Sequence, residues 1–426
     1  MSKKTKVWVY ADAPSVATGF GTVSRNILEA LHRTGRYDIE VFGINHHGDP
    51  TPNFPYNIWP AGTGSNDPYG RQKFCQMTAR KEFDILFLLQ DTFIMDFMPE
   101  LLPHLTLNRP QPCKSICYFP IDGVPKPEWI KNINYADVRV AYTEFGKQQA
   151  KEQFPEVGEM RVIPHGANLR DFTVLPKDQV EGFKKQFFGT HADKFIIMNL
   201  NRNQQRKDIP RTIQAFVEFK KQVPESILYL HMAQKDQGWN LTEVCRAHGL
   251  STSTDVIFPE NFGPNQGYPV HIVNALYNCA DVLVSTTLGE GFGLSWLEAM
   301  ATKTPVLMPD NTMFGEFITE DKGYLSKSGT NPSLLTVLPN DNEVIRPLVD
   351  VEDMVAKLLR IYNNRDEAKA KAEVAYKWIQ KEMDWQGAIA KQWVTLFDET
   401  AASLKSPAVK LPTGPAGNKV INAEMF

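Results

Sequence analysis

Short, nearly continuous apolar runs alternate along this chain with longer segments whose apolar residues recur at helical spacing. Such runs are typical of parallel strands buried on both faces, and the longer segments are typical of the helices that cover them. The strands expected in the first half are Lys6–Tyr10, Ile39–Ile44, Ile85–Leu89, Ser115–Phe119, Val138–Tyr142 and Arg161–Ile163. Those expected in the second half are Phe195–Leu200, Ile227–Met232, Val256–Phe258, Val282–Ser285 and Pro305–Met308. The pattern predicts an α/β protein with two doubly wound units in succession.

The segments between the strands predict helices. The clearest are Thr22–Arg33, Glu144–Phe154, Pro210–Gln222, Val270–Cys279 and Leu294–Thr302, followed by Val351–Asn363 and the stretch from Arg365 to Leu404. Residues 168–194 hold no convincing strand, so the junction between the units is placed there. We expect an N-terminal domain over 1–170, a C-terminal domain over 171–385, and a helix over 386–404 that packs back on the first domain. Residues 405–426 turn to Pro, Gly, Ala and Lys, which predicts a mobile tail.

Composition narrows the class of protein. A length of 426 residues favours two domains, and 42% hydrophobic with 22% charged residues is typical of a soluble globular chain. A net charge of −3 predicts no general attraction to nucleic acid, although a local basic patch stays open. No apolar run approaches the roughly 18 residues of a membrane-spanning helix. The five scattered cysteines predict reduced thiols and a cytoplasmic location, and their spacing predicts no metal site.

The stretch from Val282 to Asp310 carries the chemistry. A strand is followed by a turn with three glycines and then by a helix. Glycines let backbone amides approach a ligand, and a helix N-terminus adds a partial positive charge, so the turn favours a phosphate group. Glu290 lies within the turn, and Glu298 lies one turn into the helix. Because a carboxylate would repel the phosphate, we expect these two acids to accept hydrogen bonds from sugar hydroxyls.

This stretch resembles the donor-site signature of the retaining GT-B glycosyltransferases of family four, also called group 1. The matching residues are Glu290-Gly291-Phe292-Gly293-Leu294, Leu297-Glu298-Ala299-Met300-Ala301 and Pro305-Val306. The resemblance implies a GT-B fold, in which two Rossmann-like domains face a cleft, with the acceptor in the first and the nucleotide-sugar donor in the second. It also implies that Glu298 holds the ribose hydroxyls and that Glu290 contacts the transferred sugar and acts in catalysis. The turn residues Gly291, Phe292, Gly293 and Leu294 would meet the sugar and the diphosphate.

Basic residues follow the first strand of the second unit. Arg202 stands at its carboxyl end, where ligands bind in open α/β sheets, and Lys207 precedes the next helix. Their spacing resembles the family motif Gly-Arg-Leu-x3-Lys-Gly, whose Arg and Lys contact the diphosphate and so act in catalysis. Arg206 is placed to share that role. Asn201 and Asp208 stand where the family has glycines, which leaves the shape of the turn open.

Two glycines near the N-terminus, Gly19 and Gly21, precede a helix. They resemble the glycine loop that opens the family's N-terminal domain, where they would bind the donor diphosphate or face the acceptor. The same glycines also allow a Rossmann dinucleotide fingerprint. That alternative fits poorly, because the glycines lie well beyond the end of the first strand rather than directly after it.

Further candidates lie at strand ends of the first half. Asp122 follows a strand end where the family often has a histidine that contacts the donor sugar, so Asp122 is expected in the cleft with a catalytic role. Asp91 and the pair His46 and His47 are acceptor-side candidates. His165 belongs to a segment that resembles the family's Ile-Pro-Asn-Gly-Val-Asp, where we expect it to order the domain junction. A purely structural role is at least as open for each of these residues.

The expected function is transfer of a sugar from a nucleotide diphosphate sugar to an acceptor hydroxyl, with retention of anomeric configuration and with neither metal nor cofactor. Two other classes stay open: a non-catalytic nucleotide-sugar binding module and a nicotinamide-dependent oxidoreductase. The sequence allows a glycan, a lipid or a small molecule as the acceptor. Residues 201–207 also resemble a variant in family members encoded by large viruses and phages. That variant would make modified DNA an acceptor and the host cytoplasm the location. The sequence gives no prediction of oligomeric state.

Overall fold

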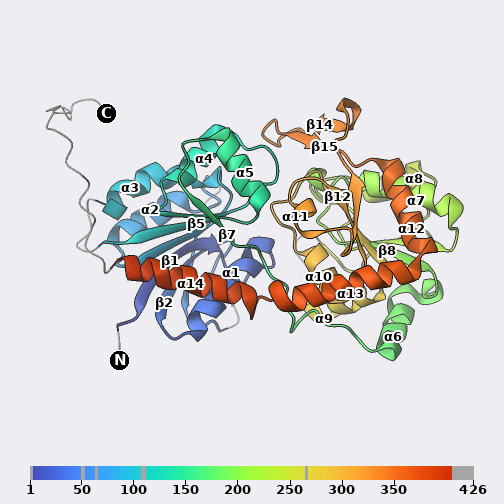
Figure 1. The fold of residues 1–426 in the computed structure, drawn as a ribbon, viewed down its shortest axis with the longest axis horizontal. Helices are drawn as coiled ribbons and strands as arrows, with labels where there is room; N and C mark the ends of the chain where they lie inside the picture. Colours follow the sequence, from blue (N-terminus) through green and yellow to red (C-terminus); the bar gives the residue numbers. More distant parts are fainter. Residues whose placement is uncertain (1–2, 49–52, 63–65, 107–111, 264–266, 405–426) are drawn as a thin grey trace.

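The computed structural model describes residues 3–48, 53–62, 66–106, 112–263 and 267–404. Two lobes lie side by side, each built on a parallel sheet with helices around it, and the last two helices run along both lobes (Figure 1). The predicted α/β class with two doubly wound units is therefore confirmed. The tail predicted to be mobile, residues 405–426, lies outside the described residues.

The N-terminal sheet has the strand order β3-β2-β1-β4-β5-β6-β7, with every pair parallel. Its strands are β1 (Thr5–Asp12), β2 (Tyr37–Ile44), β3 (Asn57–Pro60), β4 (Ile85–Leu89), β5 (Lys114–Phe119), β6 (Val138–Ala141) and β7 (Met160–Val162). All residues of β4 are buried, which explains why this central strand reads as a continuous apolar run. The sequence did not predict β3, an edge strand whose residues alternate between exposed and half-buried positions.

The α-helices described in this lobe are α1 (Gly19–Arg33), α2 (Arg71–Arg80), α3 (Met98–Thr106), α4 (Pro127–Asn134) and α5 (Glu144–Gln153). Helix α1 begins earlier than predicted. Thr18 caps it by accepting a hydrogen bond from the amide of Gly21 at 2.9 Å. Gly19 and Gly21 therefore lie in the first turn of the helix, and the expectation that they form a loop before it is wrong.

The C-terminal sheet has the order β10-β9-β8-β11-β12-β13, again parallel. Its strands are β8 (Phe195–Asn199), β9 (Ser226–Leu230), β10 (Val256–Ile257), β11 (Val282–Val284), β12 (Val306–Asp310) and β13 (Tyr324–Lys327). Its helices are α6 (Lys177–Phe188), α7 (Ile209–Gln222), α8 (Leu241–Ala247), α9 (Val270–Cys279), α10 (Ser295–Ala301), α11 (Phe314–Phe317) and α12 (Val351–Asn363). Strand β13 escaped prediction because its buried positions alternate with more exposed ones at the sheet edge.

A short antiparallel hairpin lies outside both sheets. Its strands are β14 (Leu335–Val337) and β15 (Ile345–Pro347), and it is inserted between β13 and α12. Figure 1 shows the hairpin above the junction of the two lobes. Glu343, in its loop, pairs with Lys126 of the N-terminal lobe at 2.8 Å. The sequence pattern did not predict this element.

The chain passes between the lobes twice, and the two passages are bonded to each other. Ala167 donates its amide to the carbonyl of Met383 at 2.7 Å and accepts the amide of Trp385 at 3.1 Å. The helical stretch expected over residues 365–404 is interrupted there. It forms α13 (Arg365–Glu382) along the C-terminal lobe and α14 (Ala388–Ser403) along the N-terminal lobe (Figure 1).

Helix α14 is held on the N-terminal lobe by aromatic packing. Trp393 is fully buried, and its ring centroid lies 4.6 Å from that of Tyr118 and 5.6 Å from that of Phe87. Ion pairs at the surface, such as Arg36 with Asp398 at 2.8 Å, add little beside this burial. The last helix thus packs against strands β4 and β5 of the other lobe.

Candidate functional site

The carboxyl ends of the two sheets meet where the lobes touch. Arg206 and Lys207 follow β8, and Glu290 follows β11. Asp122 follows β5 of the other lobe. Parallel strands end at a common sheet edge, so loops that are distant in sequence deliver their side chains to one place.

Glu290 is the centre of this cluster. Its carboxylate is buried and pairs through Oε1 with the ammonium of Lys207 and through Oε2 with Arg206, the latter at 3.5 Å. Burial would raise the pKa of Glu290, but the charges of Lys207 and Arg206 outweigh it and hold the pKa at about 2. Burial also lowers the pKa of Lys207, with the Glu290 carboxylate opposing it. Two cations therefore converge on one ionised carboxylate, in surroundings that suit a larger anion equally well.

The loop that carries these cations is fixed by contacts with the loop after β11. The carbonyl of Arg206 accepts the amide of Leu288 at 2.8 Å, and the hydroxyl of Thr286 donates to the carbonyl of Asp208 at 2.8 Å. Asp208 has a φ of 43°, in the left-handed region that favours glycine and that Asp tolerates better than most residues. Its carboxylate accepts the Nε–H of Arg211 at 3.1 Å. Asp208 thus adopts the turn that the family motif builds with glycine.

Asp122 joins the cluster from the N-terminal lobe. Its Oδ2 lies 3.3 Å from Nε of Arg206, and its Oδ1 lies 3.3 Å from a terminal nitrogen of Arg346. Arg346 belongs to β15, so the carboxylate bridges two cations of the C-terminal lobe. The placement of Asp122 beside Arg206 agrees with its expected position between the domains, and its catalytic role stays a prediction.

Arg202 is placed away from this cluster. Its guanidinium forms a two-point pair with the buried Asp236, with Nε–Oδ2 at 2.7 Å and a terminal nitrogen 3.3 Å from Oδ1. Almost half of its side chain is exposed. Asp236 therefore holds the arginine that the motif assigns to the diphosphate, and Arg206 takes the position beside Glu290.

The glycines of the donor turn have a packing role that the motif did not predict. A Cβ at Gly289 would overlap the carbonyl oxygen of Asp122, and a Cβ at Gly291 would overlap the ring of Pro120. Both glycines let the N-terminal lobe approach the turn closely. Gly293 has a φ of 73°, which favours glycine for a different reason. Leu294 directly precedes α10 and forms no side-chain capping hydrogen bond, and contact of these residues with a donor stays a prediction.

Phe292 points away from the surface and into the junction between the lobes. It is 2% exposed, and its ring centroid lies 4.7 Å from that of His165. The hydroxyl of Tyr118 lies 2.7 Å from the carbonyl of Ile163 and 2.8 Å from Nδ1 of His165. Since the carbonyl takes the hydroxyl proton, we assign the His165 proton to Nδ1. Burial lowers the pKa of His165 to about 3, so the ring stays neutral and orders the junction.

Glu298 stands in a different electrostatic environment from Glu290. It accepts a hydrogen bond from the hydroxyl of Tyr277 at 2.8 Å, and no cation pairs with it among the described residues. Burial raises its pKa to about 7, while the Tyr277 bond opposes the rise and Asp171 adds to it. Two acids of one motif therefore differ in charge state near neutral pH.

Asp12 is the last residue of β1, at the carboxyl edge of the N-terminal sheet, and is 4% exposed. It accepts hydrogen bonds from Thr18 Oγ1 at 2.6 Å and from the side-chain amide of Asn45 at 3.2 Å.

The two glycines at the start of α1 have different surroundings. A Cβ at Gly21 would overlap the carbonyl of Val16, whereas a Cβ at Gly19 would meet nothing within 4 Å. Gly21 is thus a packing requirement, and Gly19 faces open space.

Of the acceptor-side candidates, Asp91 lies nearest to the cluster. Burial, and next the Asp122 carboxylate, raise its pKa to about 7, while Arg206 opposes the rise. No hydrogen bond or ion pair holds the Asp91 carboxylate within the described ranges. His46 is 7% exposed and His47 is exposed, both in the loop after β2. No contact links either histidine to Glu290 or Asp122 in the described part of the chain.

The sequence missed several residues that the fold brings to this interface. These residues include Asp12 and the ion pair of Arg346 with Asp341. Tyr142 is another: its hydroxyl is buried with no hydrogen-bond partner in the described residues, and it interacts electrostatically with Asp91. Asp12 and Tyr142 could have been predicted as site residues from their positions at strand ends. Nothing in the local sequence pattern distinguishes Arg346.

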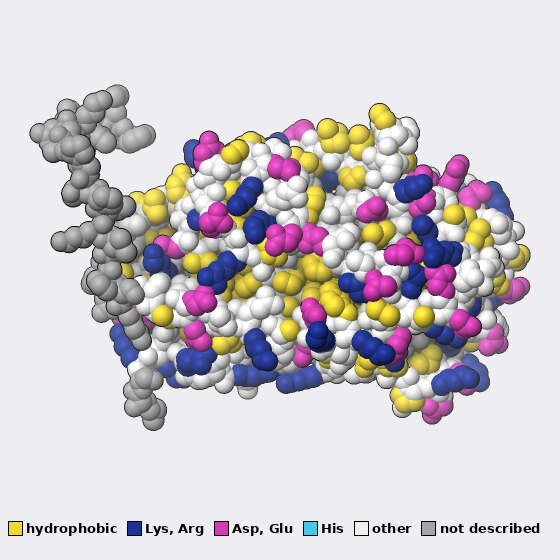
Figure 2. Space-filling view, in the orientation of Figure 1, with side chains coloured by type: hydrophobic (Ala, Val, Ile, Leu, Met, Phe, Trp, Pro, Cys, Tyr) yellow, Lys and Arg dark blue, Asp and Glu magenta, His cyan; other side chains and the backbone are white. Residues whose placement is uncertain are grey.

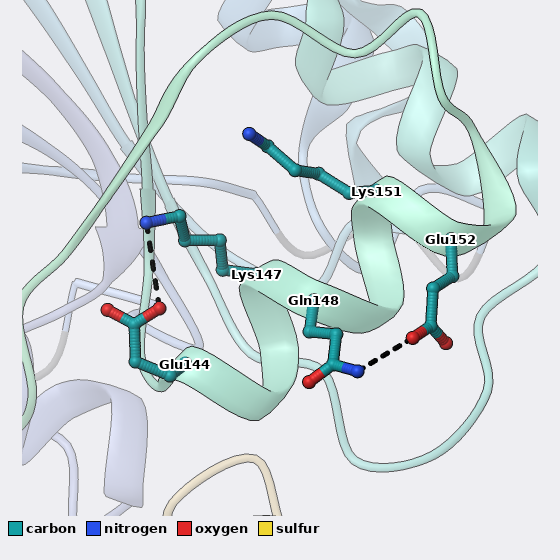
Figure 3. Close-up of a pocket in the computed structure, with 5 residues that line it drawn as sticks. All are labelled: Glu144, Lys147, Gln148, Lys151 and Glu152. Atoms are coloured by element: carbon teal, nitrogen blue, oxygen red, sulfur yellow. Dashed lines mark hydrogen bonds and ion pairs between the residues drawn. The ribbon is translucent and has the colours of Figure 1, made fainter.

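A separate hollow of about 390 Å³ lies along the outer face of α5 (Figure 3). Its lining charges are already paired, Lys147 with Glu144 at 3.5 Å and Lys151 with Glu159 at 3.5 Å. Gln148 donates to Glu152 at 2.7 Å. This hollow is formed by one helix and shares no residue with the Glu290 cluster.

The ranges that the structure describes lack two further kinds of feature. They contain no group of three or more His, Cys, Asp and Glu side chains arranged to hold a metal ion. They also contain no helix with the length and apolar character needed to cross a bilayer.

Comparison with known proteins agrees with this geometry. Residues 181–378 match the family model described as glycosyl transferases group 1. Over 201 residues the chain is 25% identical to an alpha-monoglucosyldiacylglycerol synthase of Acholeplasma laidlawii, covering 44% of this chain and 48% of that protein. Over 222 residues it is 26% identical to the putative glycosyltransferase EpsD of Bacillus subtilis (strain 168), covering 50% of this chain and 52% of that protein. The match thus spans about half the length of these relatives.

Solved structures extend the similarity to nearly the whole chain. Sucrose-phosphate synthase of Thermosynechococcus elongatus superposes with a TM-score of 0.73 at 18% identity, over 94% of this chain and 100% of that one. HepE of Anabaena, solved with UDP and glucose, gives a TM-score of 0.67 at 14% identity over 94% of this chain and 100% of that one.

Two parallel sheets of seven and six strands, meeting at their carboxyl edges, define the GT-B fold of glycosyltransferase enzymes. Within that class, residues 181–378 are similar to the group 1 glycosyl transferases, which supports the resemblance of the Glu290 motif.

Proposed function

We propose that this chain is a retaining glycosyltransferase, independent of metal and cofactor, that moves a sugar from a nucleotide diphosphate sugar to an acceptor hydroxyl. The observation that supports it most directly is the convergence of Lys207 and Arg206 on Glu290 at the meeting edges of the two sheets. A diphosphate needs fixed cations, and a sugar needs a fixed carboxylate. These three residues supply both.

The proposed reaction begins with an exchange of partners. The donor diphosphate takes Lys207 and Arg206 from Glu290, and the freed carboxylate accepts hydrogen bonds from hydroxyls of the transferred sugar. As the bond between the anomeric carbon and the diphosphate oxygen breaks, the two cations neutralise the charge that develops on the leaving group. The acceptor oxygen bonds to the same face of the anomeric carbon, and its proton passes to the leaving phosphate. No protein nucleophile is needed.

The donor assignment rests on the second acid. We propose that Glu298, ionised on binding, holds the two ribose hydroxyls of the nucleotide, with the Tyr277 hydroxyl orienting its carboxylate. UDP is the first nucleotide to test, because the similar fold of HepE was solved with UDP.

We propose that the acceptor is an uncharged hydroxyl compound, such as a glycan, a lipid or a small metabolite. The carboxyl edge of the N-terminal sheet carries Asp12 and Asp91, whose pKa values are raised by burial, and their carboxyl groups are suited to hydrogen bonds with hydroxyl groups. Basic and acidic side chains are interspersed over much of the face shown in Figure 2, although Lys and Arg side chains gather along its lower edge. The net charge of −3 gives no general attraction to nucleic acid. Modified DNA is therefore the less favoured acceptor. Cys75, Cys117, Cys245 and Cys279 form no disulfide within the described residues, which is compatible with a cytoplasmic setting that we keep as part of the proposal.

The proposal is tested first by thermal shift against a panel of nucleoside diphosphates and their sugars, with and without Mg²⁺. Stabilisation by one nucleotide without Mg²⁺ is the expected result. Hydrolysis of the matching nucleotide sugar, with the anomeric configuration of the product followed by NMR, then tests catalysis and retention. Binding without hydrolysis or transfer would instead favour a non-catalytic module, and a shift with a nicotinamide cofactor alone would overturn the proposal.

A further inference from the structure

The β14–β15 hairpin places one arginine in the junction between the lobes. Thr336 pairs with Arg346 across the hairpin, so both side chains lie on one face. On the opposite face Val337 and Ile345 are 53% and 61% exposed. Arg346 is 3% exposed. A long cationic side chain is rarely buried to this extent without specific partners.

Both lobes provide partners for Arg346. Within the hairpin, Asp341 binds its Nε at 2.7 Å and a terminal nitrogen at 3.1 Å. The other terminal nitrogen donates to the backbone carbonyl of Asp122 and lies 3.3 Å from its Oδ1. A Cβ at Gly123 or at Gly289 would come within 2.8 Å or 3.0 Å of that nitrogen. The N-terminal lobe and the donor turn thus each leave space for the guanidinium.

The Asp122 carboxylate is shared between two arginines. Oδ1 faces Arg346, and Oδ2 faces Nε of Arg206 at 3.3 Å. Arg206 also meets Glu290 at 3.5 Å. A ligand anion that recruits Arg206 must therefore draw it away from Asp122 as well as from Glu290. That exchange is less costly if a second cation keeps the Asp122 carboxylate paired, because its side chain is only 37% exposed and solvent replaces a lost partner in part.

We infer that Arg346 is a positioning residue of the donor site: it keeps Asp122 paired, so that Arg206 is free to bind the diphosphate of the donor. This inference rests on the proposed function. It assigns to the hairpin a part in donor binding, although Arg346 itself need not touch the ligand. Lys126 and Glu343 offer a matched control, because they join the same hairpin to the same lobe at 2.8 Å but in an exposed position.

The test is calorimetric titration of the full chain with UDP, or with whichever nucleoside diphosphate the thermal-shift panel selects. Arg346→Gln should weaken binding about tenfold, because the Asp122 carboxylate then depends on Arg206 alone for its pairing, and tenfold corresponds to about 1.4 kcal/mol. Asp122→Asn should strengthen binding, because Arg206 loses the carboxylate that competes with the ligand. Adding Asp122→Asn to Arg346→Gln should restore affinity to about the wild-type level, and Lys126→Gln should change it less than twofold. Arg346→Lys, which keeps the charge, should lie between Arg346→Gln and wild type.

A purely structural role would give a different pattern. If Arg346→Gln weakens binding and Asp122→Asn does not restore it, Arg346 acts through hairpin stability and the inference is wrong. Equal affinities for Arg346→Gln and Lys126→Gln would also overturn it while leaving the proposed function intact. If Arg346→Gln does not fold, the inference is tested with Asp122→Asn and Arg346→Lys. Unchanged or weaker nucleotide binding by Asp122→Asn would contradict the inference. Absence of binding by the wild type to every nucleotide would instead refute the proposed function, and this inference with it.

Discussion

The ammonium of Lys207 lies against the carboxylate of Glu290, although the two residues are 83 positions apart in the chain. Each comes from a separate sequence motif, one after β8 and one after β11, and these strands are neighbours in the sheet. The ion pair thus joins the residues expected at the diphosphate to the residue expected at the sugar. In the absence of ligand the ion pair neutralises both charges, and a donor anion has to replace Glu290 as the partner of Lys207.

Removal of Lys207 should weaken both donor binding and catalysis. Lys207→Ala leaves Glu290 with Arg206 alone and leaves the diphosphate with one cation fewer, so we expect kcat/KM to fall about 10- to 150-fold. Steady-state hydrolysis of the donor measures this, and Lys391→Ala, at an exposed position on α14, is the control. Activity equal to that of the control would refute the role of Lys207.

Nucleotide affinity should depend on pH through Glu298. Its pKa is raised from 4.5 to about 7, and only the ionised form accepts two hydrogen bonds from ribose. Affinity should therefore rise between pH 6 and pH 8 in the wild type and stay flat in Glu298→Gln, as measured by calorimetry. Asp91→Asn is the control, because Asp91 titrates in the same range and should leave the rise in place.

The same carboxyl predicts the sign of a stability change. The folded state binds the Glu298 proton more tightly than the unfolded state, so this group destabilises the fold increasingly as pH rises from about 4.5 to about 7. Glu298→Gln should therefore gain stability over the wild type across that window. Denaturant unfolding at several pH values measures the difference, and a pH-independent difference would contradict the raised pKa.

Alanine substitutions at two glycines should distinguish a glycine required for contact between the lobes from one that has no close neighbour. Gly291→Ala places a methyl group against Pro120 of the other lobe, so it should push the lobes apart and reduce donor turnover at least tenfold. Gly19→Ala, in the first turn of α1 with nothing within 4 Å, should be neutral or stabilise by up to about 1 kcal/mol. Small-angle scattering would detect the separation of the lobes, and wild-type turnover by Gly291→Ala would show that the close approach is dispensable.

The docking of α14 should depend on one tryptophan. Trp393→Ala removes a fully buried ring from between α14 and the N-terminal sheet and should cost about 3–5 kcal/mol of unfolding free energy. Trp59→Ala, at a position 41% exposed, should cost clearly less. Urea unfolding compares the two variants. Equal losses would indicate that α14 contributes no more than a surface side chain.

The central strands and the Glu290 motif could be predicted from the sequence because their signals depend on a few neighbouring residues. Central strands such as β4 and β8 are buried on both faces and therefore read as continuous apolar runs. The Glu290 motif follows another buried strand, β11. Edge elements such as β3 and β13 have one face in or near solvent, so their pattern is too weak to predict. The roles expected of Glu298, Gly19 and the histidines stay predictions.

The motif could not decide which arginine stands beside Glu290. Spacing assigned Arg202 and Lys207 to the diphosphate. Arg202 pairs with Asp236, 34 positions further along the chain, and its role at the diphosphate stays a prediction. Arg206, the secondary candidate, contacts Glu290 and Asp122. The direction in which a loop side chain points depends on its partners in space, and a spacing rule contains no information about them.

The sequence by itself determined the two-domain α/β class and the motif that carries Glu290 and Glu298, because strand burial, helical periodicity and turn glycines act over a few residues. Only the tertiary structure decided how the lobes meet. Asp122 and Arg346 are 224 positions apart, and Gly291 is a glycine partly because Pro120 of the other lobe lies against it. Such contacts follow from the packing of whole domains, and no local pattern of residues encodes them.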